Sequence, residues 1–385
     1  MPLVVGCTIE DVSTAQVDQE VIGGAAAPAG KWPDTVAVMW DGSQGCTGTL
    51  VAPNVVVTAG HCVAGGAPNG VLIGASALSK AQEGETIRVM RAIEYPNSWN
   101  TIDAGILILE TPATKATPRP IATGWARFDV KNGAQVQLVG FGTIDRDGNV
   151  STDSLMEATT TITDYNCTTS AGCNTAAQPD GELGAGGMGI DTCPGDSGGP
   201  AYLMTEFGIF LIGITSRGYD DNNYACSEGG IYERADKIVD WMEQQASVPI
   251  ARAPSPTVAP IMTTRGDAGE TKIEHNDPKT GATHTFAITK PPGFGKAAVR
   301  DDGTVRVCAD KGVAGDDALE VTVSDGADPT RAIVVKVPIV IADATPPDSC
   351  DEKNFGGEGG GCCDTRRGAG GSIPLALFVL LVLRR

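Results

Sequence analysis

The sequence predicts an all-β protein with more than one domain. Residues 21–247 contain many short runs rich in β-branched residues, such as 55–57 and 136–139, and Gly, Pro, Asn and Asp separate these runs. Short strands with turn residues between them are typical of a β-barrel or a β-sandwich. The chain has 385 residues, which is more than one domain usually holds, so we expect two domains with additional segments at the ends.

A helix and a linker are expected where this first region ends. In residues 234–245 the side chains of Ile238, Trp241 and Met242 recur at helical spacing and would share one face. Residues 248–258 are rich in proline and alanine, a composition typical of a semi-rigid linker. The first domain is therefore predicted to end in a helix before the linker begins.

Residues 259–342 predict a second β domain, a β-sandwich, with Asp- and Gly-containing turns at 301–304 and 324–326. Its strand-like runs cover residues 285–289, 304–307, 320–323 and 332–341. The acidic turns leave calcium binding open as an alternative, although isolated Asp-Gly pairs are usually plain turns. No CxxC repeat with paired histidines occurs, so we expect no zinc site and assign no metal ligands.

The two ends of the chain are interpreted as segments for export and attachment. The apolar stretch at residues 1–6 lacks a basic start and is too short for a secretory signal, and we interpret residues 1–20 as a propeptide or a signal remnant. Residues 343–372 form a flexible Gly/Cys-rich segment, and residues 373–385 hold eleven apolar residues followed by two arginines. Eleven apolar residues are too few to span a bilayer comfortably, because a spanning helix needs about 20.

Charge and cysteine content restrict the partners and the compartment. The formal net charge of −19 argues against nucleic acid as a partner and favours attraction of basic ones. Eleven cysteines argue against a reducing cytosol. We therefore expect the protein to be secreted or held at the cell surface.

Three segments carry the residue types of nucleophilic catalysis: Thr58-Ala59-Gly60-His61-Cys62, Asp103-Ala104-Gly105-Ile106-Leu107 and Gly195-Asp196-Ser197-Gly198-Gly199-Pro200. A serine hydroxyl is a poor nucleophile at neutral pH and needs an adjacent base. Imidazole suits that task, because its unperturbed pKa of about 6.5 lets it accept and return a proton near pH 7. Of the three histidines in the chain, only His61 lies within residues 21–247, so it is the candidate base.

Through these three segments, residues 21–247 resemble the trypsin/chymotrypsin family of serine proteases. The chain order His, Asp, Ser is one of those known for such triads. The resemblance implies two six-stranded β-barrels with a C-terminal helix, and no cofactor. It implies that His61 is the base, Asp103 its orienting carboxylate and Ser197 the nucleophile. The N–H groups of Gly195 and Ser197 would then form the oxyanion hole.

The same resemblance implies activation by a cut before Val21. In the family, such a cut before Val-Ile-Gly-Gly frees an α-amino group, which turns inward and pairs with the aspartate beside the nucleophile, here Asp196. Glu20 stands where the family usually has Lys or Arg. We therefore expect a separate activating protease rather than self-activation. The alternative is that Val21 simply begins a strand.

The resemblance also implies a substrate preference. Asp191 stands six residues before the serine, where the trypsin branch carries the acid at the base of its primary pocket. A poorly solvated carboxylate pairs strongly with a guanidinium or ammonium group, so protein or peptide substrates with Arg or Lys are expected. Ser216, Gly218 and Gly230 resemble the pocket walls. Arg217 replaces the usual tryptophan, and we expect the adjacent subsite to favour acidic residues.

Three disulfide pairings are implied by resemblance: Cys46–Cys62, Cys167–Cys173 and Cys193–Cys226. The loop between the second pair is shorter than its equivalent in most of the family. Cys308 stands alone in the second domain, where it could be a buried free thiol.

The C-terminal half resembles two further kinds of segment. Residues 259–342 are similar to bacterial immunoglobulin- or cadherin-like modules through the runs Pro-Gly-Phe-Gly-Lys, Asp-Gly-Thr-Val and Val-Ser-Asp-Gly. The role implied is that of a spacer or docking module. The Gly/Cys-rich segment, apolar run and terminal arginines resemble a myxobacterial-type C-terminal sorting signal. That resemblance implies attachment to the membrane or cell surface.

Two classes of function remain open at this point. The first is a secreted or surface-attached serine endopeptidase that cuts after Arg or Lys. The second is a catalytically silent binding or adhesion protein with a protease-like fold. The intact set of His61, Asp103, Ser197 and the glycines beside the serine favours the first, because silent relatives usually lose one of these residues.

Overall fold

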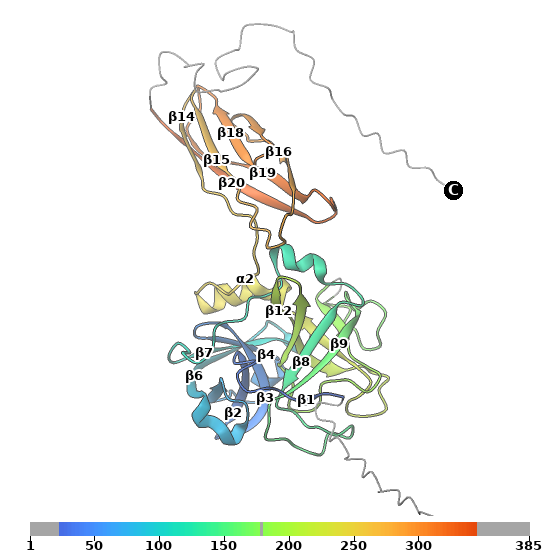
Figure 1. The fold of residues 1–385 in the computed structure, drawn as a ribbon. Coiled ribbons are helices and arrows are strands. Elements are labelled where there is room, and N and C mark those ends of the chain that lie inside the picture. The colour runs from blue at the N-terminus through green and yellow to red at the C-terminus, as the bar shows by residue number, and fades with distance from the viewer. Residues whose placement is uncertain (1–22, 178–179, 345–385) are drawn as a thin grey trace, which may run out of the picture. The chain divides into compact units, whose positions relative to one another are not determined.

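The computed structural model describes residues 23–177 and 180–344 (Figure 1). They form two compact units, of which the first contains the described residues up to Ser255 together with 277–281 and the second contains the rest. The predicted propeptide, the cut before Val21 and the Gly/Cys-rich and apolar tail from residue 345 onwards lie outside the described residues.

Six strands close the first barrel, in the order β2-β3-β4-β7-β6-β5. They are β2 Thr35–Trp40, β3 Ser43–Ala52, β4 Val55–Thr58, β5 Gly70–Ile73, β6 Glu85–Glu94 and β7 Gly105–Leu109. Between them lie α1 His61–Ala64 and the 3₁₀ turns η1 Leu78–Glu83 and η2 Ser98–Asn100. The predicted β-branched run becomes β4, which is buried at all four positions, as a short continuous apolar run allows.

The second barrel is a ring of six strands in the order β8-β9-β10-β13-β12-β11, closed by the pairing of β8 with β9. Its strands are β8 Gln135–Gly140, β9 Met156–Asp164, β10 Glu182–Ala185, β11 Pro200–Thr205, β12 Gly208–Gly218 and β13 Gly230–Arg234. The short β1 Ala25–Ala26 adds to β9, and η3 Gly124–Asp129 precedes β8. The prediction of two six-stranded barrels is confirmed.

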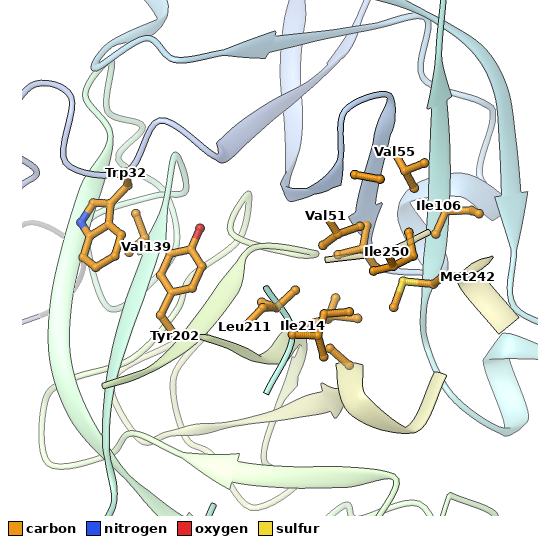
Figure 2. Close-up of a cluster of buried hydrophobic side chains, with 14 of the residues drawn as sticks. Trp32, Val51, Val55, Ile106, Val139, Tyr202, Leu211, Ile214, Met242 and Ile250 are labelled. Atoms are coloured by element: carbon orange, nitrogen blue, oxygen red, sulfur yellow. The ribbon is translucent and has the colours of Figure 1, made fainter. Parts of the chain in front are cut away.

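One hydrophobic cluster draws on both barrels and on the closing helix (Figure 2). Val51 and Ile106 enter it from the first barrel, Leu211 and Ile214 from β12 of the second, and Met242 from the helix. All five are fully buried. Burying a side chain of this size contributes about 1.5–3 kcal/mol, so this shared core is a major reason that the barrels form one unit.

A buried polar cluster crosses the same interface. Asp34, next to β2, receives two hydrogen bonds from the Arg119 guanidinium, at 2.6 and 2.9 Å, and one from the Tyr202 hydroxyl of β11 at 2.6 Å. Trp32 stacks on Tyr202 with 4.9 Å between ring centroids (Figure 2). Asp34 is only 1% exposed, and buried charges are tolerated when paired and hydrogen-bonded in this way.

The predicted helix is confirmed as α2 Ala235–Ala246, with Ile238 and Met242 buried and Trp241 partly buried. The linker expected at 248–258 differs from the structure over its first half. Ile250 and Ala253 are buried, and Ala251 donates a backbone hydrogen bond to Val51 of β3. Composition alone does not reveal that these residues pack on the barrels rather than connect two units.

The second unit contains two sheets, of order β14-β20-β19-β16 and β15-β18-β17. Their strands are β14 Ile261–Thr264, β15 Ala268–Lys272, β16 His284–Lys290, β17 Gly295–Val299, β18 Thr304–Ala309, β19 Gly315–Asp325 and β20 Ala332–Ala342. Burial alternates along β18 and β19, so each sheet has one buried face. The two sheets agree with the predicted second β domain. The resemblance to immunoglobulin- or cadherin-like modules stays a prediction.

The structure bears on the expectations for Cys308 and for the acidic turns. Cys308 is disulfide-bonded, so the expectation of a free thiol is wrong. In the turns, Asp302 accepts a hydrogen bond from the N–H of Thr304 and Asp325 from that of Ala327, at 3.0 and 2.8 Å. These carboxylates therefore stabilise their own turns. Among the described residues, no helix is long and apolar enough to cross a membrane.

Candidate active site

The pairing of two strands brings His61 and Asp103 together. Strands β4 and β7 are antiparallel neighbours, with Thr58 opposite Gly105. His61 follows the end of β4 and Asp103 precedes the start of β7, so both side chains leave the first barrel at the same place. Residues far apart in sequence thus become neighbours because their strands share hydrogen bonds.

The Asp103 carboxylate binds His61 at two points, one on the imidazole and one on the backbone. Its Oδ2 lies 2.8 Å from His61 Nδ1, and its Oδ1 accepts the backbone N–H of His61 at 2.8 Å. The Ser216 hydroxyl donates to the same Oδ2 at 2.7 Å. Burial by itself would raise the pKa of Asp103, but the hydrogen bond and charge of His61, with the Ser216 hydrogen bond, outweigh it. The pKa therefore lies below its ordinary value, and Asp103 is ionised at neutral pH.

The loop that carries Ser197 is pinned between the barrels. The carbonyl of Ser197 accepts a hydrogen bond from the N–H of Thr47 in β3 at 2.8 Å. The N–H of Gly198 donates to the carbonyl of Thr215 in β12 at 2.7 Å. Gly198 has a φ of +81°, and a Cβ there would lie 2.1 Å from the Thr58 hydroxyl, so only glycine fits. Ser197 consequently lies against the segment that leads to His61.

Two backbone N–H groups beside Ser197 are available to a ligand. Gly195 adopts a φ of +99°, which turns its carbonyl onto the side chains of Gln44 and Thr47, each at 2.9 Å. Within the described structure, the N–H groups of Gly195 and Ser197 donate to no hydrogen bond. Unpaired N–H groups at this place are suited to binding an oxygen that gains negative charge.

Asp196 points away from this loop into the protein. It is 1% exposed, and its two oxygens accept the N–H groups of Gly142 at 2.7 Å and Cys193 at 2.9 Å. A Cβ at Gly140 or Gly142 would lie within 2.5 Å of the carboxylate, so both glycines leave room for it. Burial raises the pKa of Asp196 to about 7, because these two hydrogen bonds only partly replace water.

Asp191 is a second buried carboxylate near the loop. It accepts backbone N–H groups from Thr192, Ser227 and Gly229 at 2.8, 3.0 and 2.9 Å. Burial outweighs these hydrogen bonds and raises its pKa to about 6. The two glycines predicted to wall its pocket, Gly218 and Gly230, are direct partners across β12 and β13.

Sequence reasoning missed two glutamates. Glu182 and Glu233 are 1% and 0% exposed, and both lie beside the guanidinium of Arg217, at 2.6 and 3.5 Å. The charge of Arg217 is therefore compensated from inside the protein. The expected preference of the adjacent subsite for acidic substrate residues would need an unpaired cation, and the guanidinium of Arg217 is already paired. A buried acid beside Arg217 could be suspected, but nothing in the sequence indicates which of the many acids it is.

The three disulfides implied by resemblance are present: Cys46–Cys62, Cys167–Cys173 and Cys193–Cys226. They account for the sulfurs in the two groups of close metal-ligand types among the described residues, which are His61 with the first pair and Asp164 with the second. Disulfide sulfurs are not thiolate ligands, so neither group has the donors of a cysteine metal site.

A sequence model described as Trypsin matches residues 21–242. The chain belongs to the trypsin family. Human Serine protease 56 is 30% identical to it over 259 residues, which cover 63% of this chain and 42% of that protein. Trypsin of Saccharopolyspora erythraea is 30% identical over 237 residues, covering 58% of this chain and 97% of that protein.

Mouse Serine protease 56 is 31% identical over 258 residues, or 63% of this trypsin-family chain and 41% of that protein. The chain thus spans about two fifths of the length of the two Serine protease 56 relatives. A solved structure of neuropsin, a serine protease of mouse brain, covers 58% of this chain and 98% of its own, with 25% identity and a TM-score of 0.48.

The raised pKa of Asp196 predicts a specific pH dependence of stability in the uncut chain. Its folded pKa is about 7, against an ordinary value of 3.8, so between these values the folded state keeps a proton that the unfolded state loses. Stability therefore falls as pH rises from about 4 to about 7. Asp196 contributes on the order of 4 kcal/mol to that fall, at about 1.4 kcal/mol per pKa unit.

Urea unfolding of wild type and Asp196→Asn at several pH values measures this contribution. We expect the wild type to lose stability relative to the variant over that range. Asp221→Asn, at an exposed acid, serves as the control and should follow the wild type. Parallel curves for wild type and Asp196→Asn would show that Asp196 keeps an ordinary pKa.

Proposed function

We propose that this chain is a serine endopeptidase that cuts peptide bonds after Arg or Lys through an acyl-enzyme. The observation that supports it most is the arrangement of His61, Asp103 and Ser197. The first barrel supplies an imidazole held by an ionised carboxylate, and the second supplies a serine flanked by free N–H groups. The family membership supports the same reaction class.

In the proposed reaction, His61 takes the proton of the Ser197 hydroxyl as the oxygen attacks the substrate carbonyl carbon. The carbonyl oxygen becomes negative and accepts the N–H groups of Gly195 and Ser197. His61 then gives its proton to the leaving amine, and the C–N bond breaks. Water then attacks the resulting ester: His61 takes a proton from the water and gives it to the Ser197 oxygen as the ester C–O bond breaks and the acid product leaves. Asp103 keeps the Nδ1 proton of the imidazole directed at itself throughout.

Asp191 is the proposed determinant of substrate choice. Its carboxylate is buried among backbone N–H groups, and among the described residues no cation is paired with it. A substrate guanidinium would supply that cation and favour the charged form of the carboxyl. Charge-assisted pairs of this kind are roughly twice as strong as neutral hydrogen bonds. An apolar side chain would instead leave the carboxylate without a partner.

A cut between Glu20 and Val21 is proposed to activate the protein, and Asp196 is the proposed partner of the new N-terminus. Its carboxylate is fully buried, and two N–H groups do not offset the cost of its charge. A free α-amino group at Val21 would be a suitable partner. Removing one partner of a buried ion pair commonly costs about 3–5 kcal/mol, which is enough to switch the ordering of the loop beside Ser197.

Export to the medium or the cell surface is part of the proposal. Three disulfides in the first unit support it, since such bonds persist in oxidising compartments. The second unit is proposed as a spacer or docking module, and the apolar tail as the attachment signal.

Replacing the nucleophile tests the proposed function. Ser197→Ala should lower the hydrolysis of peptide amides and esters by more than about 1000-fold. Labelling by a fluorophosphonate probe should disappear, while the thermal unfolding midpoint stays unchanged. Ser79→Ala, at a serine on an exposed 3₁₀ turn, should keep full activity. A processed wild type that neither reacts with the probe nor hydrolyses substrates would favour a catalytically silent binding protein.

Substrate profiling tests the role of Asp191. Wild type should prefer Arg or Lys over Phe or Leu by more than about 1000-fold in kcat/KM. Arg should exceed Lys if the pairing is bidentate. Asp191→Ser should abolish that preference yet keep fluorophosphonate labelling, and Asp221→Ser should behave as wild type. Cleavage of a peptide library after Phe, Leu or Glu would place Asp191 outside the primary pocket.

Activation can be tested with a glutamate-specific endopeptidase, which recognises Glu20 directly. The chain that starts at Met1 should be nearly inert, and the product with Val21 at its N-terminus should be active. Glu20→Gln should block activation by this protease. Asp196→Asn should lower activity of the cut chain by more than about 100-fold, the equivalent of 3 kcal/mol. Full activity in uncut protein, with its N-terminus verified by mass spectrometry, would contradict the proposed switch.

A further inference from the structure

The guanidinium of Arg217 is held on several sides. Its Nη2 donates to Glu182 at 2.6 Å and to the carbonyl of Gly172 at 2.8 Å. Its Nη1 donates to the hydroxyl of Ser216 at 3.1 Å and lies 3.5 Å from Glu233. A planar group with this many partners has one orientation, so Arg217 is a fixed donor rather than a mobile surface charge.

The charges of this cluster balance inside the protein. Both carboxylate oxygens of Glu182 have a hydrogen-bond partner, because the second oxygen accepts the N–H of Asn174 at 2.7 Å. Burial, and then the charge of Glu182, raise the pKa of Glu233 well above its ordinary value. The ion pair of Arg217 and Glu182 compensates the guanidinium charge inside the protein.

Ser216 links this ion pair to Asp103. A serine hydroxyl has one hydrogen, and here that hydrogen is directed at Asp103 Oδ2 over 2.7 Å. Arg217 donates to the acceptor side of the same hydroxyl. Because the guanidinium occupies that side, it fixes the rotation of the hydroxyl. Hydrogen bonds in such a chain also strengthen one another.

A second connection reaches the backbone two residues before Asp103. Asn174, whose N–H is bound by Glu182, donates its side-chain amide to the carbonyl of Thr101 at 2.7 Å. Thr101 lies two residues before Asp103 in the chain. Glu182 therefore stabilises both the backbone that leads to Asp103 and, through Arg217, the hydroxyl on its Oδ2.

We propose that Arg217, paired with Glu182, is a positioning residue that orients Asp103 through the hydroxyl of Ser216. This inference rests on the proposed function, because it assigns Arg217 a part in the same reaction. Arg217, which replaces the family's usual tryptophan, would then act on the orientation of Asp103 rather than contact the substrate.

The test is a double-mutant cycle in the processed full chain. One arm replaces the ion pair as a unit, Glu182→Met with Arg217→Met, since exchanging a buried pair for apolar side chains is often tolerated by the fold. The other arm is Ser216→Ala. We expect the paired replacement to lower kcat by about 10- to 100-fold while KM changes less than about threefold. In the Ser216→Ala background the same replacement should cost at least about threefold less, because the route through Ser216 is gone and only the one through Asn174 and Thr101 remains.

Two further variants test whether the effect depends on the geometry of Arg217. Arg217→Lys should lower kcat by less than the paired replacement does, since an ammonium group cannot donate to Glu182 and Ser216 with the same geometry. Arg252→Met is the matched control. Arg252 also bridges two acids, Asp240 and Glu243, at 2.7 Å each, and its side chain is 37% exposed against 33% for Arg217. It has no link to Asp103 and should keep kcat within about twofold.

The outcomes separate the two proposals. An equal loss of kcat in both backgrounds, or no loss in either, would overturn the positioning role while leaving the protease intact. A change confined to KM would assign Arg217 to substrate contact instead. If the paired replacement does not fold, Arg217→Lys with and without Ser216→Ala gives the same comparison. A processed wild type without Ser197-dependent hydrolysis would overturn both proposals.

Discussion

The hydrogen bonds that hold residues 195–199 between two barrels determine most of what surrounds them. The carbonyl of Ser197 binds β3 of the first barrel, and the N–H of Gly198 binds β12 of the second. Both hydrogen bonds keep their geometry only if the barrels are held in place relative to each other. The shared core around Leu211 and Ile214 provides that constraint, together with the buried cluster of Asp34, Arg119 and Tyr202. The candidate site is thus a property of the interface rather than of either barrel.

Several buried acids in the first unit have unusual pKa values. Asp191, Asp196 and Glu233 all have raised pKa values, and in each case burial is the largest cause. In the described structure the partners of Asp191 and Asp196 are mainly backbone N–H groups, which are weaker compensation than a cation, whereas Glu233 lies 3.5 Å from the guanidinium of Arg217. Asp103 differs, because hydrogen bonds from His61 and Ser216 keep its pKa low. Burying several carboxylates costs stability, and strongly raised pKa values of this kind are typical of functional sites.

Arg217 departs from the family pattern, and two buried glutamates compensate its charge. A charged side chain at a half-buried strand position needs compensation, and here it comes from β10 and β13, the strands on which Glu182 and Glu233 lie. The same guanidinium also reaches Ser216. A substitution that looks like a change of surface chemistry in the sequence is therefore connected to the interior of the molecule.

The sequence alone determined the class of the fold, the helix α2 and the three segments with His61, Asp103 and Ser197, because these depend on local periodicity and on short motifs. The family resemblance supplied the barrels and the disulfide pairs. The packing of Ile250 and Ala253 on the barrels was hidden by a linker-like composition, and the bonded state of Cys308 by its isolation in sequence. The partners of Arg217 were decided only by tertiary structure. Glu182 and Glu233 lie 35 and 16 residues away from it, and strand pairing and burial, which no local pattern encodes, bring them to one guanidinium.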